Sequence, residues 1–151
     1  WGMDKPEFLI SANQGEEPRP LRRIVSGGEM SRIMLAIKSV LADTDTIQSI
    51  IFDEIDAGIG GEVAIAVGQY LSELSEHKQV LCITHLATIA VHADNHLRVE
   101  KITTDTRTET GVAKISGSEI VSEIARMLAG DSTGDTSRAH AEEMLRAAGK
   151  S

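Results

Sequence analysis

Two strand-like runs with a helical stretch between them constrain the fold of this chain most strongly. Residues 47–52 and 79–84 are rich in Ile, Val, Leu and Phe, and we expect each to form a strand buried on both faces. Between them, residues 62–75 carry apolar side chains at the spacing of an amphipathic helix. A strand, a helix and a second strand predict parallel pairing through a right-handed crossover. The predicted fold class is α/β, with a parallel sheet core and flanking helices.

Another helix is predicted directly after a Gly-rich segment. Apolar residues recur at helical spacing from Gly27 onward, Ser26 is a natural N-cap, and Glu29 three residues later completes a capping box. The sequence shows no clear domain boundary, so we expect a single domain over residues 1–151 with a strand pair near its C-terminal side. The other predicted elements are a strand at 7–12, a short helix at 86–92, a strand pair at 95–103 and 106–115, and helices at 118–128 and 137–148.

The overall composition argues against several function classes. A net charge of −8 and an aromatic content of 3% disfavour broad electrostatic attachment to DNA and an aromatic platform for single strands. The one cysteine excludes an internal disulfide and is typical of a reducing compartment. No apolar run has the length of a membrane span, so we expect a cytoplasmic protein with no membrane partner. Because the chain begins with Trp1, we expect it to be a piece of a longer protein.

The segment Ser26-Gly27-Gly28-Glu29 is a candidate anion-binding site. Unpaired backbone N–H groups at a helix start attract anions, and glycines allow a phosphate to approach the backbone closely. The helix-dipole contribution is only about 0.3–1 kcal/mol, so this loop by itself would bind a nucleotide weakly. The alternative is a well-capped helix start that binds nothing.

Asp53 and Glu54 are candidate groups for handling a metal and a water molecule. Two adjacent carboxylates at the end of a strand repel one another unless a cation or a reacting water is present. Successive strand residues point in opposite directions, so one acid can hold Mg²⁺ while the next orients and deprotonates water. The alternative is a solvated acidic turn. The apolar residues leading into the pair favour the functional interpretation.

His85 follows the next predicted strand along the chain. Ligands of parallel α/β sheets bind at the carboxyl ends of the strands, so His85 is expected near the end that carries Asp53 and Glu54. There a neutral imidazole could form a hydrogen bond with a terminal phosphate. By itself, a single histidine is more often structural.

In this order, the segments resemble motifs in the ATPase heads of the ABC and SMC superfamily. Residues 25–29 resemble the signature loop, 50–54 the Walker B strand with its glutamate, 56–58 the D-loop, and 84–86 the switch histidine. The longer forms SGGEMSR, FDEIDAGIGG and CITHL are similar, more narrowly, to the RecN family of bacterial SMC-like DNA repair ATPases. The resemblance covers the chain from Phe8 to Leu145, as the C-terminal lobe of such a head.

The resemblance implies a role for each matching residue. Asp53 would bind Mg²⁺, Glu54 would position and activate water, and His85 would contact the γ-phosphate of ATP. ABC-type heads hold two ATP molecules between two copies, so the implied partners are a second head in an ATP-dependent homodimer and, through the full-length protein, DNA at the nucleoid. The implied cofactor-binding residues are Ser26, Gly27, Gly28 and Glu29, which face the ATP of the opposite head, and Asp56, which would communicate across the dimer interface.

The sequence departs from a complete head in one respect. It contains no G-x-x-x-x-G-K-[ST] loop, and in this family that Walker A loop and the coiled coil precede the matching region. We therefore expect the N-terminal half of the head to be a required partner for ATP hydrolysis, and the chain alone to be inactive. The alternatives are a catalytically silent module for head dimerisation or DNA contact, and a head from another ABC or SMC branch.

Overall fold

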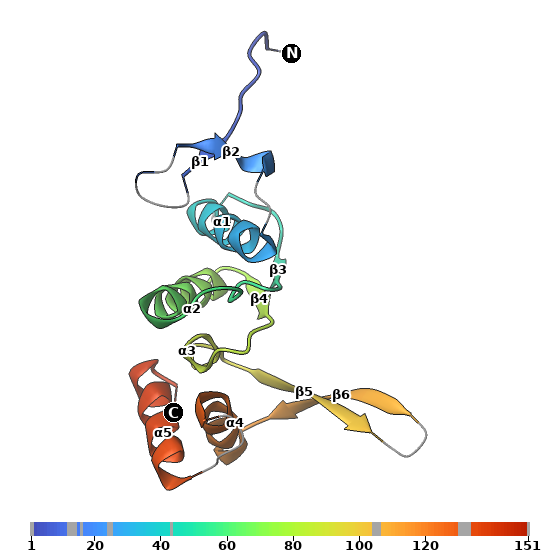
Figure 1. Ribbon diagram of the computed structural model, residues 1–151, viewed down its shortest axis with the longest axis vertical. Helices are drawn as coiled ribbons and strands as arrows, with labels where there is room; N and C mark the ends of the chain where they lie inside the picture. The colour runs from blue at the N-terminus through green and yellow to red at the C-terminus, as the bar shows by residue number, and fades with distance from the viewer. Residues whose placement is uncertain are drawn as a thin grey trace.

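The computed structural model describes residues 2–11, 15, 17–23, 26–42, 44–103, 107–129 and 134–150. In this part of the chain the elements form an elongated stack with one projecting hairpin (Figure 1). Val25 of the predicted signature loop, Ala12 of the first predicted strand and residue 106 of the strand pair lie outside the described residues. Among the described residues, no helix is both long and apolar enough to cross a membrane.

The predicted parallel pair is confirmed. Strand β3 (Ser49–Phe52) pairs in parallel with β4 (Gln79–Cys82), and helix α2 (Gly61–Ser75) makes the crossover between them. Both strands are shorter than the sequence pattern suggests. The class is therefore α/β, and the parallel sheet in the described residues is this two-stranded pair.

Helix α1 (Gly27–Val40) begins where the capping pattern predicts and lies beside α2 (Figure 1). The backbone N–H of Glu29 donates a hydrogen bond of 3.5 Å to Ser26 Oγ, which satisfies one N–H group at the helix start. Buried side chains from α1, β3, α2 and the segments that follow form one apolar core. Its buried members are Leu35, Phe52, Ile55, Ala64, Val67, Leu71, Leu74 and Ile89.

The prediction that both strands are buried on both faces is wrong. Phe52 is 2% exposed, whereas its neighbour Ile51 is 68% exposed and Ile83 beyond β4 is 61% exposed. Successive strand residues point to opposite faces, and the described residues cover only the face that carries Phe52. The second face of the pair is thus apolar and open.

The buried face of α2 also differs from the predicted one. The helical spacing of apolar residues places Val63 and Tyr70 on the same face as Val67, Leu71 and Leu74, but Val63 and Tyr70 are each 53% exposed. Val67, Leu71 and Leu74 of that face are buried, and the buried stripe also includes Ala64 and Gly68.

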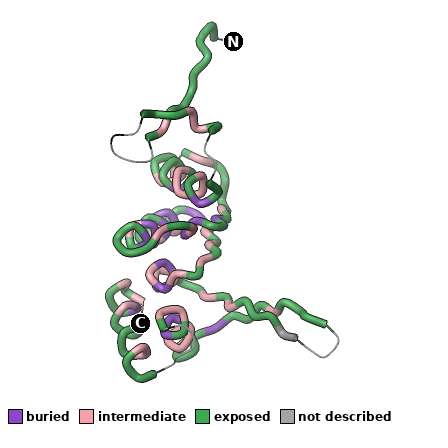
Figure 2. Tube along the Cα trace, in the orientation of Figure 1, coloured by how far each residue is buried: buried purple, intermediate pink, exposed green. Residues whose placement is uncertain are grey.

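A second apolar core lies towards the C-terminal end, where α3 (Ala87–Ala90), α4 (Ser118–Ala129) and α5 (Asp135–Ala147) pack together. Figure 2 shows buried residues in each of these helices and mostly exposed residues along the projecting hairpin. The predicted strand pair forms that hairpin, with β5 (His96–Thr103) antiparallel to β6 (Thr108–Ile115). The core members are Ala87, Val91, Ile124, Ala125, Ala141 and Leu145.

The remaining elements lie at the opposite end of the molecule. Strands β1 (Leu9–Ile10) and β2 (Arg19–Pro20) form a short antiparallel pair, followed by a 3-10 turn at Leu21–Arg23. These elements lead directly into the segment before α1 (Figure 1).

Candidate functional site

The turn after β3 is the point at which the predicted motifs meet. Asp53 Oδ1 accepts a hydrogen bond of 2.9 Å from the backbone N–H of Glu54, and Glu54 has a φ of +57°. A left-handed backbone at a non-glycine residue costs on the order of 1–3 kcal/mol and is often found at functional sites. Glu54 O accepts a hydrogen bond of 3.0 Å from the Ala57 N–H, which closes the turn. The strained residue is therefore the predicted catalytic glutamate.

The start of α1 lies directly against this turn. A Cβ on Gly27 would lie 2.6 Å from Glu54 Oε2, and a Cβ on Gly28 would lie 2.8 Å from Glu54 O and 2.9 Å from the Ala57 Cβ. Both distances are shorter than real Cβ contacts, so only glycine fits at either position without a shift. The structure thus brings the two glycines of the predicted signature loop to the predicted catalytic residue of the same chain.

Two residues that the sequence analysis did not single out join α1 to the turn. Ser31 Oγ donates a hydrogen bond of 2.8 Å to Asp53 O. Arg32 Nη1 donates to Ile55 O at 3.1 Å and to Ala57 O at 3.0 Å. Their spacing in the sequence could have identified them, because each follows Gly27 or Gly28 by one helical turn and therefore lies on the same helix face.

Asp56 joins the turn to the segment after β4. Its side chain is 5% exposed, and Oδ2 accepts hydrogen bonds from Thr84 Oγ1 at 2.6 Å and from the backbone N–H of His85 at 2.8 Å. Burial, the largest single cause, raises the pKa of Asp56, but the hydrogen bonds from Thr84 and from the His85 backbone, with smaller contributions from the nearby His85 ring and the backbone of Asp56, together hold the pKa below its ordinary value. Asp56 is therefore ionised at neutral pH.

His85 also contacts Asp56 through its ring. Nδ1 lies 2.9 Å from Asp56 Oδ2, while the imidazole as a whole is 75% exposed. The Asp53 and Glu54 side chains are exposed at the same end of the strand pair. The expectation that Asp56 acts across a dimer interface remains a prediction, since the contacts described for its carboxylate all lie within this chain.

The residues at the turn fit a magnesium ion shared with a nucleotide better than an all-protein metal centre. Within the described ranges, no three or more His, Cys, Asp or Glu residues form a group that could hold a metal ion. Mg²⁺ commonly uses one or two carboxylates and fills its other positions with phosphate oxygens and water. The exposed carboxylate of Asp53 can supply one such ligand.

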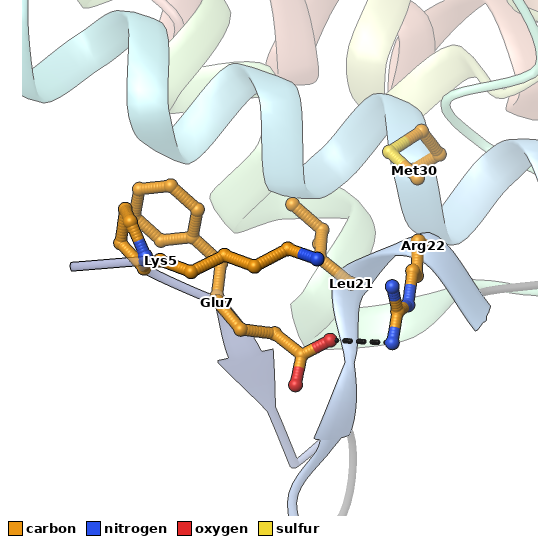
Figure 3. Close-up of a pocket in the computed structure, with 7 residues that line it drawn as sticks. Lys5, Glu7, Leu21, Arg22 and Met30 are labelled. Atoms are coloured by element: carbon orange, nitrogen blue, oxygen red, sulfur yellow. Dashed lines mark ion pairs between the residues drawn. The ribbon is translucent and has the colours of Figure 1, made fainter. Parts of the chain in front are cut away.

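A pocket of about 560 Å³ lies elsewhere, between the N-terminal residues and the start of α1 (Figure 3). Two of its lining residues form an ion pair, with Arg22 Nη2 2.8 Å from Glu7 Oε1 (Figure 3). None of the predicted site residues lines it; its lining is Lys5, Pro6, Glu7, Phe8, Leu21, Arg22 and Met30. The candidate site is therefore an exposed surface at the strand ends.

Sequence comparison relates the chain to one set of curated proteins. It is 58% identical over 147 residues to the DNA repair protein RecN of Treponema pallidum, covering 97% of this chain and 26% of that protein. The chain is similar to the C-terminal part of RecN. The RecN proteins of Bacillus subtilis and Streptomyces coelicolor are 47% and 44% identical to it, again over 97% of this chain and 26% of theirs. The chain thus spans about a quarter of the length of these RecN relatives.

Two other comparisons add less to the RecN assignment. No protein-family model matches the chain. A solved structure from work on ATP-driven dimerization and DNA-stimulated activation of SMC ATPases overlays with a TM-score of 0.48 and 22% identity, covering 72% of this chain and 71% of the other. That likeness is slight.

Proposed function

We propose that this chain is the C-terminal lobe of a RecN-type ATPase head and that it completes an ATP-hydrolysing site in the full-length protein. The observation that carries the proposal is the convergence of Gly27, Gly28, Glu54, Asp56 and His85 around one strained turn. The RecN relatives are DNA repair proteins, which supports coupling of hydrolysis to double-strand-break repair at the bacterial nucleoid.

Asp53 and Glu54 take different roles in this proposal. Asp53 holds Mg²⁺ together with the phosphates of ATP, and the ion supplies charge neutralisation there. Glu54 orients the attacking water and accepts its proton, an effect typically worth about 10²–10⁴ in rate. Their exposed carboxylates follow one another at the carboxyl end of β3, so they can reach the same ligand from the strand end.

The start of α1 binds a phosphate of the ATP that a second head holds. Its backbone N–H groups form the surface on which a phosphate can bind, with Ser26 as the cap. Glu29 lies in the first helical turn. A Cβ on Gly27 would lie 2.6 Å from Glu54 Oε2, so a phosphate bound at this helix start would lie close to the proposed catalytic carboxylate.

The N-terminal half of the head is the proposed partner of the open apolar surfaces. Ile51 and Ile83 are 68% and 61% exposed on the uncovered face of the strand pair. On the hairpin, Leu97 and Val99 of β5 and Val112 of β6 share one face, since alternate strand residues and their cross-strand partners do so. Each is at least 61% exposed. Contiguous apolar surface of this kind marks an interface, and the RecN relatives have three-quarters of their length to provide the partner.

The test is ATP turnover by the complete protein, compared with turnover by Glu54→Gln. We expect the variant to lose about 10²–10⁴ in kcat while still binding ATP, because it keeps the size of the side chain and loses the base. Glu62→Gln is the matched control, since Glu62 is an exposed acid in the first turn of α2. Unchanged turnover in Glu54→Gln would contradict the catalytic assignment.

A second arm tests completion by the N-terminal half. The chain is mixed with a separately produced N-terminal half that carries a Walker A loop, and turnover and complex formation are measured together. We expect turnover only in the mixture. A stable complex that stays inactive with and without DNA would contradict the enzyme proposal and favour a dimerisation module.

A further inference from the structure

We propose that Asp56 is a positioning residue for His85: it sets the orientation of the imidazole and holds its proton on Nδ1, which leaves Nε2 as the outward-facing acceptor. The inference about the ring stands on the geometry alone. Its consequence for ATP hydrolysis rests on the proposed function, in which His85 is one of the residues of the ATP site.

The geometry has three parts that act on one oxygen. Asp56 Oδ2 accepts hydrogen bonds from Thr84 Oγ1 at 2.6 Å and from the His85 backbone N–H at 2.8 Å, and the ring nitrogen Nδ1 of His85 lies 2.9 Å from the same oxygen. The first two contacts hold the backbone of the segment after β4 against the turn after β3. The third holds the ring itself, so the side chain of His85 is oriented although it is 75% exposed.

The position of the proton on the His85 ring follows from the ionised carboxylate of Asp56 beside it. An ionised carboxylate accepts hydrogen bonds and has none to donate, so the ring nitrogen beside Asp56 must carry a proton. A hydrogen bond at one nitrogen of a neutral histidine decides the state of the other. With the proton at Nδ1, Nε2 of the neutral ring has a free lone pair.

This assignment changes what His85 can do next to a phosphate. A neutral ring with a bare Nε2 can accept a hydrogen bond from the water that attacks the phosphate. It can donate one to a phosphate oxygen only after Nε2 takes up a second proton.

A purely structural role for Asp56 would leave the tautomer of His85 unconstrained, and nitrogen NMR separates the two cases. The complete protein is labelled with ¹⁵N-histidine, and the His85 resonance is assigned by its loss in His85→Gln. In the unaltered protein at a pH where the ring is neutral, we expect a protonated Nδ1 and a bare Nε2. A protonated Nε2 in that sample overturns the proposal, whatever any variant does.

Asp56→Ala then removes the acceptor. We expect the ring to lose its preference for the Nδ1 proton and, in the complete protein, kcat to fall about 10- to 100-fold, the range found when the hydrogen-bond partner of a metal-bound histidine is removed. Asp56→Asn keeps an oxygen acceptor and should retain more of the Nδ1 preference than Asp56→Ala. Equal tautomer populations in the unaltered protein and in Asp56→Ala overturn the proposal.

Asp45→Asn is the matched control. Asp45 is also a carboxylate that accepts from a side chain, Lys38, and from a backbone N–H, that of Ile47, but its described contacts do not include His85. We expect its loss to leave the His85 tautomer unchanged. If the complete protein hydrolyses no ATP, the proposed function fails while the NMR result still decides the pairing of Asp56 with His85.

Discussion

Glu54 Oε2 lies where a side chain on Gly27 would have to be, 2.6 Å from the position of a Cβ there. The carboxylate of the predicted catalytic residue therefore fills the space that the glycine leaves open at the start of α1. Gly28, the next residue, meets the backbone of the same turn at 2.8 Å. These two neighbouring glycines can be tested against each other.

Gly27→Ala should mainly lower ATP turnover, whereas Gly28→Ala should mainly lower stability. The Cβ of Gly27→Ala meets the flexible end of Glu54, which can swing away, so we expect nearly unchanged stability but reduced ATP turnover in the complete protein. The Cβ of Gly28→Ala meets Glu54 O and the Ala57 Cβ, so we expect about 1–3 kcal/mol of lost stability. Urea unfolding and turnover assays measure both effects. Equal loss of stability in the two variants would contradict this distinction.

Arg32→Met should destabilise the turn that carries the site. The change removes the donor to Ile55 O and Ala57 O while keeping the length of the side chain, and we expect a loss of about 1–3 kcal/mol in the free energy of unfolding. Arg22→Met is the control, since the pairing of Arg22 with Glu7 is largely exposed and such pairs contribute about 0–1 kcal/mol. If urea unfolding shows similar losses for both variants, Arg32 does not hold the turn.

Cys82 should react slowly with thiol reagents in the folded protein. Its side chain packs against the first apolar core, and burial, with smaller contributions from Asp56 and Asp53, raises its pKa to about 11. Because the thiolate is the reactive form, little of it is present at neutral pH. Modification by an aromatic disulfide should be slow in buffer and fast in denaturant. Rapid labelling without denaturant would show that β4 is not packed as described.

Stability should fall as the pH drops below about 6.5, the ordinary pKa of histidine. Burial, with a smaller contribution from Lys150, holds the pKa of His92 below that value, so the unfolded chain takes up a proton before the folded chain does. Stability from His92 is thus present above the unfolded pKa and lost as the pH falls towards the folded one.

His92→Gln should make thermal unfolding less sensitive to pH in this window. His96 remains as a second contributor, since its pKa is also lowered by burial. Asp56 acts in a separate, more acidic window, because the pKa of its carboxyl is lowered and its contribution is lost only as the pH falls below about 4. An identical pH dependence in His92→Gln would contradict the assignment to His92.

Much of the fold could be predicted from the sequence alone, because it depends on interactions between residues close together in the chain. The spacing of apolar residues predicted α2 and α5, and Ser26 with Glu29 predicted the start of α1, because helix periodicity and capping act over only three or four residues. The parallel pairing of β3 with β4 also followed from the order of elements. The resemblance to RecN was also recognisable from short, contiguous segments, and the identity to RecN proteins agrees with it.

Only the tertiary structure decided which groups meet. The exposure of Ile51 depends on which face of the strand pair other elements cover. Arg32 donates hydrogen bonds to backbone carbonyls that lie 23 and 25 residues further along the chain. The burial of Asp56 and its contact with His85 depend on two segments 29 residues apart lying side by side. Sequence periodicity carries no information over such separations. The identities of the site residues were therefore determined locally, and their partners by long-range packing.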